Sequence, residues 1–273
     1  MQKIDRLGWA AGLAFTSYGV RVGIRVNMAE VLETIKGYLP PAWKPATRSR
    51  VERLYSLVVG TAPARAGVRT FNLLYSDATR ISRSLKLDEV LERFDDDLKL
   101  FVAEATRRRV FVHAGVVGWN GKAIVIPGRS FTGKTTLVAE LVRQGATYYS
   151  DEYAVLDERG CVHPYLRPLS IRDSASGKVE RVNAARLGGR YGRKPLPVGL
   201  VVVSNYREGA RWRPRKLTAG QGALAMFANT VPARSRPEAA LSVFREIAPH
   251  AQVLKSVRGE ARETVDSILQ ELS

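Results

Sequence analysis

The spacing of apolar residues divides the chain into two regions with different patterns. The first hundred residues combine alternating apolar runs with two stretches of helical periodicity, which predicts both strands and helices. Beyond residue 109 the pattern changes to short apolar runs separated by turn residues. We therefore expect a small N-terminal α+β accessory region over residues 1–109 and a larger α/β domain over residues 110–273. The expected elements of the first region are strands at 20–26 and 68–75 and helices at 28–39 and 87–107.

The second region has the pattern of a sheet flanked by helices. Asn120-Gly121 between two apolar runs is typical of a hairpin turn. Apolar residues from Leu137 to Val142 repeat at helical spacing, and three later segments do the same. Strands are expected at 110–117, 122–127, 146–149, 153–156, 162–165, 196–204 and 253–257, and later helices at 219–229, 237–247 and 261–272.

A glycine-rich segment joins the strand at 122–127 to the helix after it. The segment matches the phosphate-loop pattern G-x-x-x-x-G-K-[ST] without a gap. In such loops, backbone N–H groups point at nucleotide phosphates at the positive end of the following helix. Lys134 would reach the β- and γ-phosphates of ATP, and the Thr135 hydroxyl would bind Mg²⁺, which prefers oxygen ligands. The expected nucleotide-binding residues are Gly128, Arg129, Ser130, Phe131, Thr132, Gly133, Lys134, Thr135 and Thr136.

Two neighbouring carboxylates follow the loop lysine by seventeen and eighteen positions. Asp151 and Glu152 come directly after the strand expected at 146–149, which we place next to the strand that leads into the loop. Ligands of open α/β sheets collect at the carboxyl ends of the strands. One carboxylate could therefore hold the metal while the other accepts a proton from an attacking hydroxyl. The alternative is a pair of acids that only opens a turn.

The formal net charge of +17 is high for an enzyme, and much of it is local. Residues 178–216 contain eleven Lys or Arg against two Glu. Within them, residues 186–195 are glycine-rich and are expected to form a mobile loop that closes over phosphates or an acidic partner. A solvated basic face without a partner is the alternative. Nucleic acid is an unlikely partner, because few aromatic residues accompany this charge and no nucleic-acid motif is present.

The sequence says less about cellular location and oligomeric state than about the nucleotide site. Lys3 and Arg6 precede an apolar stretch from Leu7 to Phe15, which imitates a short secretory signal, but a strand-like alternation follows in place of a cleavage pattern. Together with a single cysteine, Cys161, this favours the cytoplasm. No run approaches the roughly 18 apolar residues of a membrane span. The sequence is compatible with a homo-oligomer.

The motifs together resemble the catalytic domain of the bacterial HPr kinase/phosphorylase family, and more closely its HPr-kinase-like relatives of unassigned substrate. The resemblance implies an α/β fold with a phosphate loop, a mixed sheet and flanking helices, related to phosphoenolpyruvate carboxykinase. It also implies an ATP-dependent serine kinase in which Asp151 is the general base and Glu152 helps to bind Mg²⁺. His113 then lies beside the phosphate loop, and Arg172 neutralises the transferring phosphate. The matching segments are 112–117, 124–135, 141–146 and 149–152, with a weaker likeness over 169–172.

Two departures from the family pattern bear on substrate and reaction. Phe131 stands where the family usually has glycine, so that a bulky ring lies in the loop. The family signature Glu-Ile-Arg-Gly is replaced by Ser170-Ile171-Arg172-Asp173, which loses the acid implicated in metal binding and in the reverse reaction. This loss argues against phosphorylase activity and against HPr as the substrate.

The expected function is a Mg²⁺-ATP kinase that phosphorylates a hydroxyl, with serine of a peptide or small protein of acidic character favoured as acceptor. A small-metabolite kinase of the same fold is an alternative. A second alternative is a regulatory or scaffold protein that binds nucleotide without transferring phosphate. A third, a nucleic-acid-dependent NTPase or polynucleotide kinase, predicts stimulation by DNA or RNA and a steep dependence on salt.

Overall fold

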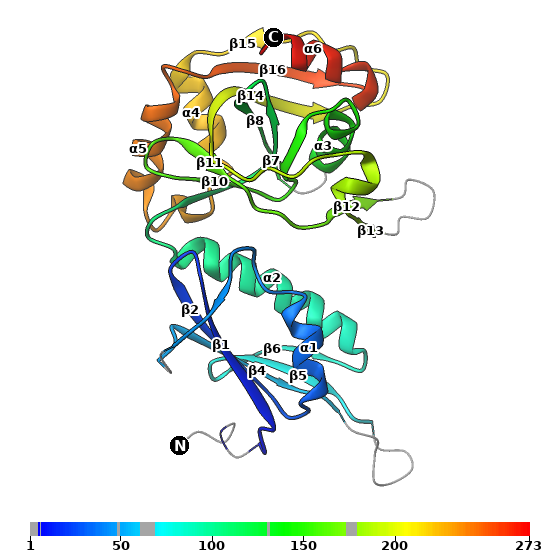
Figure 1. Cartoon of the computed structure of the whole chain (residues 1–273), viewed down its shortest axis with the longest axis vertical. Helices are drawn as coiled ribbons and strands as arrows, with labels where there is room; N and C mark the ends of the chain where they lie inside the picture. Colours follow the sequence, from blue (N-terminus) through cyan, green and yellow to red (C-terminus); the bar gives the residue numbers. More distant parts are fainter. Residues whose placement is uncertain (1–4, 6, 48–49, 61–68, 130–131, 173–178) are drawn as a thin grey trace. The chain divides into compact units, whose positions relative to one another are not determined.

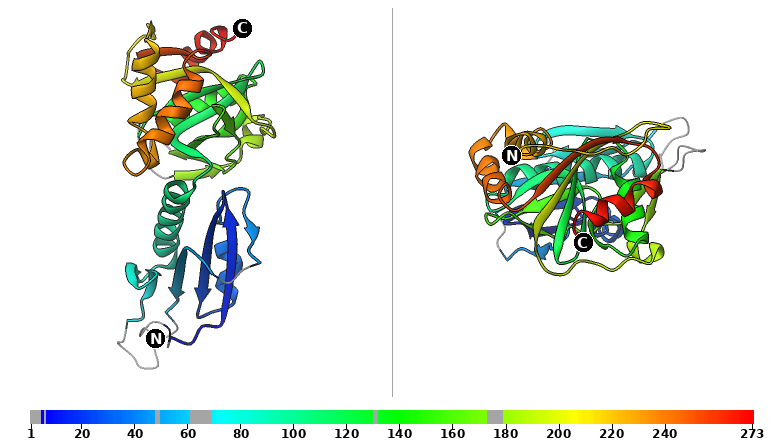
Figure 2. Two further views of the ribbon diagram at one scale, coloured as in Figure 1. Left: turned by 90° about the vertical axis from the view of Figure 1, so that its left-hand side faces the viewer. Right: turned by 90° about the horizontal axis from the view of Figure 1, so that it is seen from above.

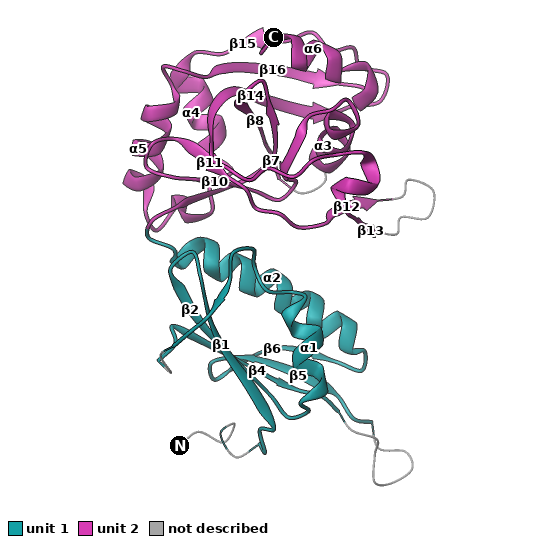
Figure 3. Ribbon diagram, viewed as in Figure 1, with its two compact units in different colours: residues 1–107 teal, residues 108–273 magenta. Residues whose placement is uncertain are grey.

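The computed structural model describes residue 5 and residues 7–47, 50–60, 69–129, 132–172 and 179–273. The chain forms two compact units, residues 1–107 and residues 108–273 (Figure 3). The boundary expected from the sequence lies two residues further along. Both units combine helices with sheets, so the fold belongs to the mixed α/β kind. Among the described residues, none of the helices combines the length and the apolar character that a membrane span requires.

The first unit is a six-stranded sheet with two helices packed against it (Figure 1). The long helix α2 begins at Leu87, and Asp88 and Glu89 in its first turn complement the positive end of the helix dipole. Its apolar residues pack with those of α1 and of alternate strand positions into one core. In chain order the elements are β1 (Ala11–Ser17), β2 (Val20–Val26), α1 (Glu30–Lys36), β3 (Lys44–Pro45), β4 (Arg53–Val58), β5 (Asn72–Ser76), β6 (Thr79–Ser84) and α2 (Leu87–Ala105).

The second unit is built on a larger mixed sheet with the order β11-β10-β7-β8-β14-β16-β15. Strands β8, β14 and β16 run parallel, β9 pairs with β7, and pairing of β11 with β14 closes five strands into a ring. The strands of this sheet are β7 (Val110–Trp119), β8 (Lys122–Pro127), β9 (Thr147–Ser150), β10 (Tyr153–Leu156), β11 (Cys161–His163), β14 (Leu196–Tyr206), β15 (Arg215–Lys216) and β16 (Gln252–Arg258). Strands β12 (Leu169–Arg172) and β13 (Val179–Val182) pair with each other as a separate two-stranded sheet. The α-helices of the second unit are α3 (Lys134–Arg143), α4 (Ala219–Phe227), α5 (Pro237–Ile247) and α6 (Val265–Gln270), and 3₁₀ turns lie at Ala184–Leu187, Val231–Ala233 and Ala261–Glu263.

Helices cover this sheet from both sides. Helices α3 and α6 bury one set of alternate strand residues, including Ile124 and Ile126, whereas α4 and α5 bury the opposite set, including Val125. Figure 2 shows the orange α5 and the red α6 on opposite sides of the strands. Every residue of β8 after Lys122 is therefore buried, which explains its continuous apolar run.

Most expected elements of the second unit are confirmed, and β8, β10 and α5 have the expected bounds. The hairpin turn is also confirmed, since Asn120 and Gly121 both have positive φ values, 46° and 75°. The helix expected at 261–272 is instead a 3₁₀ turn followed by α6. The placement of the strand before Asp151 was wrong: β9 pairs with β7 and not with β8. The ten-residue β7 has β8 on one side, which leaves its other side for β9 and β10.

Candidate functional site

The loop between β8 and α3 starts at the end of a buried strand. The N–H of Gly128 donates to the backbone carbonyl of His113, 3.1 Å away, so His113 in β7 lies beside the loop. The loop ends at Gly133, which caps α3 with a left-handed φ of 81° that glycine adopts without strain. Ser130 and Phe131 lie outside the described residues. Strand, left-handed glycine and helix follow one another in the order that a phosphate loop requires.

The Lys134 side chain folds back and contacts its own loop. Its Nζ donates to the Arg129 carbonyl at 2.6 Å, and the Thr132 hydroxyl donates to the same oxygen at 2.9 Å. Burial lowers the pKa of Lys134, and the negative charges of Asp151 and Glu152 oppose that shift. If a phosphate bound at the loop, the Lys134 ammonium could donate to a charged phosphate oxygen in place of the Arg129 carbonyl. A charged acceptor forms the stronger hydrogen bond with an ammonium group.

Thr135, the residue after Lys134, contacts the acidic strand end directly. The Thr135 hydroxyl donates to Oδ2 of Asp151 over 3.3 Å, and the backbone N–H of Ser170 donates to the same oxygen over 3.1 Å. Asp151 is only 8 % exposed. Three elements, α3, β9 and β12, therefore converge on one buried carboxylate.

Asp151 also faces a buried tyrosine. The Tyr148 hydroxyl lies 3.0 Å from Oδ1 of Asp151 and 2.8 Å from the carbonyl oxygen of Arg167. One hydroxyl proton serves one acceptor at a time. Burial raises the pKa of Asp151 above its usual range, against the opposing effect of its hydrogen bonds. A protonated Asp151 would donate to Tyr148, and Tyr148 to Arg167, which satisfies all three groups.

The oxygen atoms at this place fit a magnesium ion bound to phosphates. Adjacent ligands of an octahedral Mg²⁺ with bonds of about 2.1 Å lie roughly 3 Å apart. With the Thr135 hydroxyl 3.3 Å from Oδ2 of Asp151, this carboxylate would lie beside an ion that Thr135 holds. Within the described part of the chain no group of three or more His, Cys, Asp or Glu could hold a metal. Mg²⁺ in nucleotide sites takes one or two protein oxygens and completes its shell with phosphates and water.

The remaining predicted residues lie on several elements of the second unit. Glu152 follows Asp151, and its backbone carbonyl accepts from the N–H of Ala114 in β7 over 3.2 Å. Arg172 ends β12, two residues after the Ser170 N–H that donates to Asp151. The His113 ring packs on the Tyr153 ring with centroids 4.8 Å apart, which gives it a structural contact as well as its position beside the loop. Thr136 lies in the first turn of α3.

The glycine-rich part of the basic segment is tied to β9. The backbone N–H of Tyr148 donates to the Arg190 carbonyl at 2.7 Å, and Gly192 donates back to Tyr148 at 2.8 Å. The Tyr149 hydroxyl donates to the Lys194 carbonyl at 2.7 Å. These bonds tie the backbone of residues 190–194 to β9. The side chains of Arg190, Arg193 and Lys194 remain exposed beside the strand that leads to Asp151.

Two contributors to the site were not identified from the sequence. Tyr148 looks like any core aromatic of a strand. Arg258 ends β16 and is 1 % exposed, and its Nη2 donates to the carbonyl of Gly133 over 2.7 Å. A cation at the carboxyl end of a parallel strand could have pointed to Arg258. The chain has 43 Lys and Arg, however, so this position alone does not single it out.

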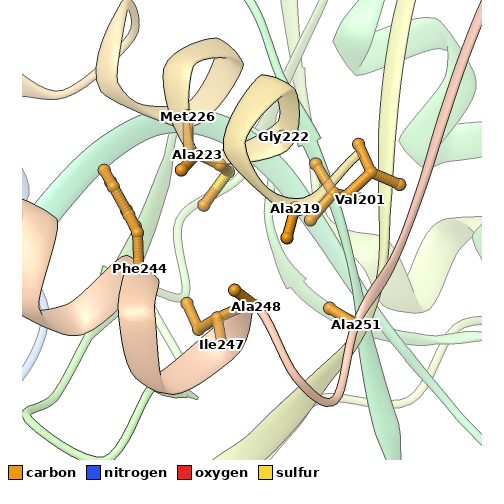
Figure 4. Close-up of a pocket in the computed structure, with 10 residues that line it drawn as sticks. Val201, Ala219, Gly222, Ala223, Met226, Phe244, Ile247, Ala248 and Ala251 are labelled. Atoms are coloured by element: carbon orange, nitrogen blue, oxygen red, sulfur yellow. The ribbon is translucent and has the colours of Figure 1, made fainter. Parts of the chain in front are cut away.

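An apolar pocket lies apart from this site. It is enclosed by α4, α5, β14 and β16, and Figure 4 shows the side chains of Met226, Phe244 and Ile247 around it. Its lining has no charged or hydrogen-bonding side chain and includes none of the residues predicted to bind nucleotide. It therefore lacks the groups that phosphate binding needs.

Neither a protein-family model nor a curated protein matches the chain. The chemistry of the site therefore rests on its geometry. The Thr135 hydroxyl meets a buried carboxylate next to Lys134 and the N-terminus of α3, and this combination can bind a phosphate chain and accept a proton.

Proposed function

We propose that the protein is an ATP- and Mg²⁺-dependent phosphotransferase that moves the γ-phosphoryl group to a serine hydroxyl of a peptide or small protein. The observation that carries the proposal is the contact between the Thr135 hydroxyl and the buried carboxylate of Asp151. It joins the phosphate-loop motif to the acidic strand end, two features that are separated in the sequence. A glycine-rich turn that matched the motif by chance would have no reason to make this contact.

Binding would begin at the N-terminus of α3. The loop N–H groups would hold the phosphates, and Lys134 would leave the Arg129 carbonyl for the β- and γ-phosphate oxygens. The Thr135 hydroxyl and Glu152 would hold Mg²⁺, which supplies charge neutralisation for the phosphates. Arg172 is the candidate cation on the acceptor side.

Transfer would need a base for the acceptor hydroxyl. Asp151 suits this role because burial raises its pKa and makes it a better proton acceptor than an exposed carboxylate. The acceptor oxygen forms a bond to the γ-phosphorus, the bond to the β–γ bridging oxygen breaks, and ADP leaves with that oxygen. The acceptor proton passes to Asp151.

An acidic peptide fits the surface beside β9. Arg190, Arg193 and Lys194 are exposed and their backbone is fixed. Charges at the rim of a site increase encounter with an oppositely charged partner. A function that consumes ATP also suits the cytoplasmic location expected from the sequence.

We also propose that residues 108–273 have the phosphate-loop fold of the HPr-kinase-like proteins. The order of β8, loop and α3 and the parallel neighbours β14 and β16 support this relationship. The exposed Ser170, which replaces the acid of the family signature, favours a second candidate function: nucleotide binding without transfer.

Labelled ATP distinguishes the two candidates. Purified protein is incubated with γ-labelled ATP, Mg²⁺ and host lysate, and labelled species are identified by mass spectrometry. We expect a labelled serine-containing peptide or protein with the wild type, and a loss of about 10²-fold or more with Asp151→Asn. Glu158→Gln, which removes an exposed carboxylate from the hairpin turn after β10, is the matched control. ATP binding without any labelled acceptor would favour the non-catalytic alternative.

A further inference from the structure

Strand β16 ends in a buried arginine at the edge of the sheet that carries the phosphate loop. Arg258 is 1 % exposed and pairs with Tyr206 of β14. Its strand, β16, lies beside β14 in the sheet (Figure 1). Removing a guanidinium group from water costs free energy unless it finds good partners. The burial of this charge therefore indicates a structural or functional role for Arg258.

The partners of Arg258 are main-chain oxygens. Nη2 donates to the carbonyl of Gly133 over 2.7 Å, and Nη1 donates to the carbonyl of Gly259 over 2.9 Å. The ring of Tyr206 lies with its centroid 5.7 Å from Cζ, within the range of a cation–π contact. Nε is buried and has no hydrogen-bond partner among the described residues. The shorter of the two hydrogen bonds is thus the one to the loop.

The carbonyl that Arg258 binds controls the orientation of a peptide group at the anion site. The Gly133 oxygen also accepts the first hydrogen bond of α3, from the N–H of Leu137 at 3.1 Å. The C=O and N–H of a trans peptide point in opposite directions. The Gly133 oxygen and the Lys134 N–H belong to the same peptide group. Because the oxygen points along α3, the N–H points out of the helix N-terminus, toward the place where phosphate would bind.

A second observation supports this relationship. A Cβ atom at Gly133 would clash with the Arg258 guanidinium and would also lie 3.4 Å from Cβ of Tyr206. Glycine at this position thus permits both the left-handed φ and the close approach of the arginine.

We propose that Arg258 is a positioning residue that holds the Gly133–Lys134 peptide in the orientation needed to bind the phosphates of a nucleotide. This inference rests on the proposed function, since it needs a phosphate ligand at the loop. Arg258 acts through the loop, and its positive charge also favours an anion at the start of α3.

The test measures phosphate affinity and the fraction of competent protein separately. MgATP and Mg-tripolyphosphate are titrated by calorimetry into the full-length wild type, Arg258→Met, Arg258→Lys and the control Lys255→Met. Lys255 is an exposed cation of the same strand. We expect Arg258→Met to raise Kd for both ligands about tenfold or more at unchanged stoichiometry, as for loss of a charged hydrogen bond. Arg258→Lys should be intermediate, because one ammonium group keeps the charge but cannot span both carbonyls.

Three results would overturn the inference or its basis in distinguishable ways. Wild-type Kd values in both Arg258 variants would refute the positioning role and leave the proposed function intact. Reduced stoichiometry with unchanged Kd would show that Arg258 only stabilises the fold, which also refutes it. A wild type that binds neither ligand would refute the proposed function itself. If Arg258→Met does not fold, the Kd and stoichiometry of Arg258→Lys test the inference.

Discussion

The substitution Asp151→Asn should make the second unit more stable while it abolishes the proposed chemistry. Asp151 is buried, and burial raises its pKa. A group whose pKa is raised in the folded state stabilises the fold only while it is protonated in both states, and this contribution is lost as the pH rises through the folded pKa. At a pH above its folded pKa, the wild type therefore carries a buried carboxylate that the amide variant lacks.

The surrounding hydrogen bonds suit an amide. The side-chain oxygen of the introduced asparagine can accept from Thr135 and from the N–H of Ser170, as Oδ2 does now. Its NH₂ group can donate to the Tyr148 oxygen, which frees the Tyr148 proton for the Arg167 carbonyl. Each unit by which the pKa of Asp151 is raised corresponds to about 1.4 kcal/mol at a pH above both values. Asp151→Ala is the contrasting variant, because it removes the acceptor of Thr135 and of the Ser170 N–H and puts no polar group in its place.

Hydrogen exchange is the suitable assay, because a chain of two units need not unfold in one transition. Amides of β7 and β8 report on the second unit. The protection of these amides in Asp151→Asn, relative to the wild type, should increase as the pH rises, and the difference should shrink toward acid as the wild-type carboxyl becomes protonated in both states. A difference that is absent at all pH values, or that grows toward acid, would refute the argument from burial.

Two further predictions concern the loop and the basic surface. Gly133→Ala should weaken MgATP binding. In urea unfolding it should destabilise the second unit by more than the roughly 1–2 kcal/mol that a left-handed φ costs a residue with a Cβ, because this Cβ also meets Arg258. The control Gly121→Ala, at φ 75° with open space around it, should show only the backbone cost. Neutralising Arg190, Arg193 and Lys194 together should raise the KM of an acidic acceptor without changing ATP affinity, and the difference from wild type should shrink with added salt. Equal KM values at low salt would identify these residues as an ordinary solvated face, whereas lost ATP affinity would make the segment part of the nucleotide site.

The sequence was most informative where structure depends on local pattern. The apolar run of β8 and the helical spacing of α3 are each set by neighbouring residues, and the motif between them is continuous. The acidic pair was placed at the same edge of the sheet as the loop, and the structure brings Thr135 and Asp151 within 3.3 Å. Both inferences follow from short segments whose direction is fixed by the strand that precedes them.

Features that depend on distant pairing were missed. The position of β7 between β8 and β9 follows from competition among strands for the two sides of a ten-residue strand, which no local pattern encodes. Strand β4 escaped notice because its sequence, Arg53–Val58, does not alternate cleanly. Arg258 approaches Gly133 across 125 positions of the chain, and its role depends on burial that its residue type does not predict.

The central claim is that the loop ending at Lys134 binds the phosphates of ATP with Mg²⁺. Calorimetric titration of MgATP into the wild type and Lys134→Ala tests it most directly, with Lys122→Ala, an exposed lysine at the start of β8, as the matched control. We expect one site in the wild type and in the control, and a sharply weakened site in Lys134→Ala, because its ammonium group is the side-chain cation that the loop places at the phosphates. Equal affinity in wild type and Lys134→Ala, or no binding to either, would contradict the account.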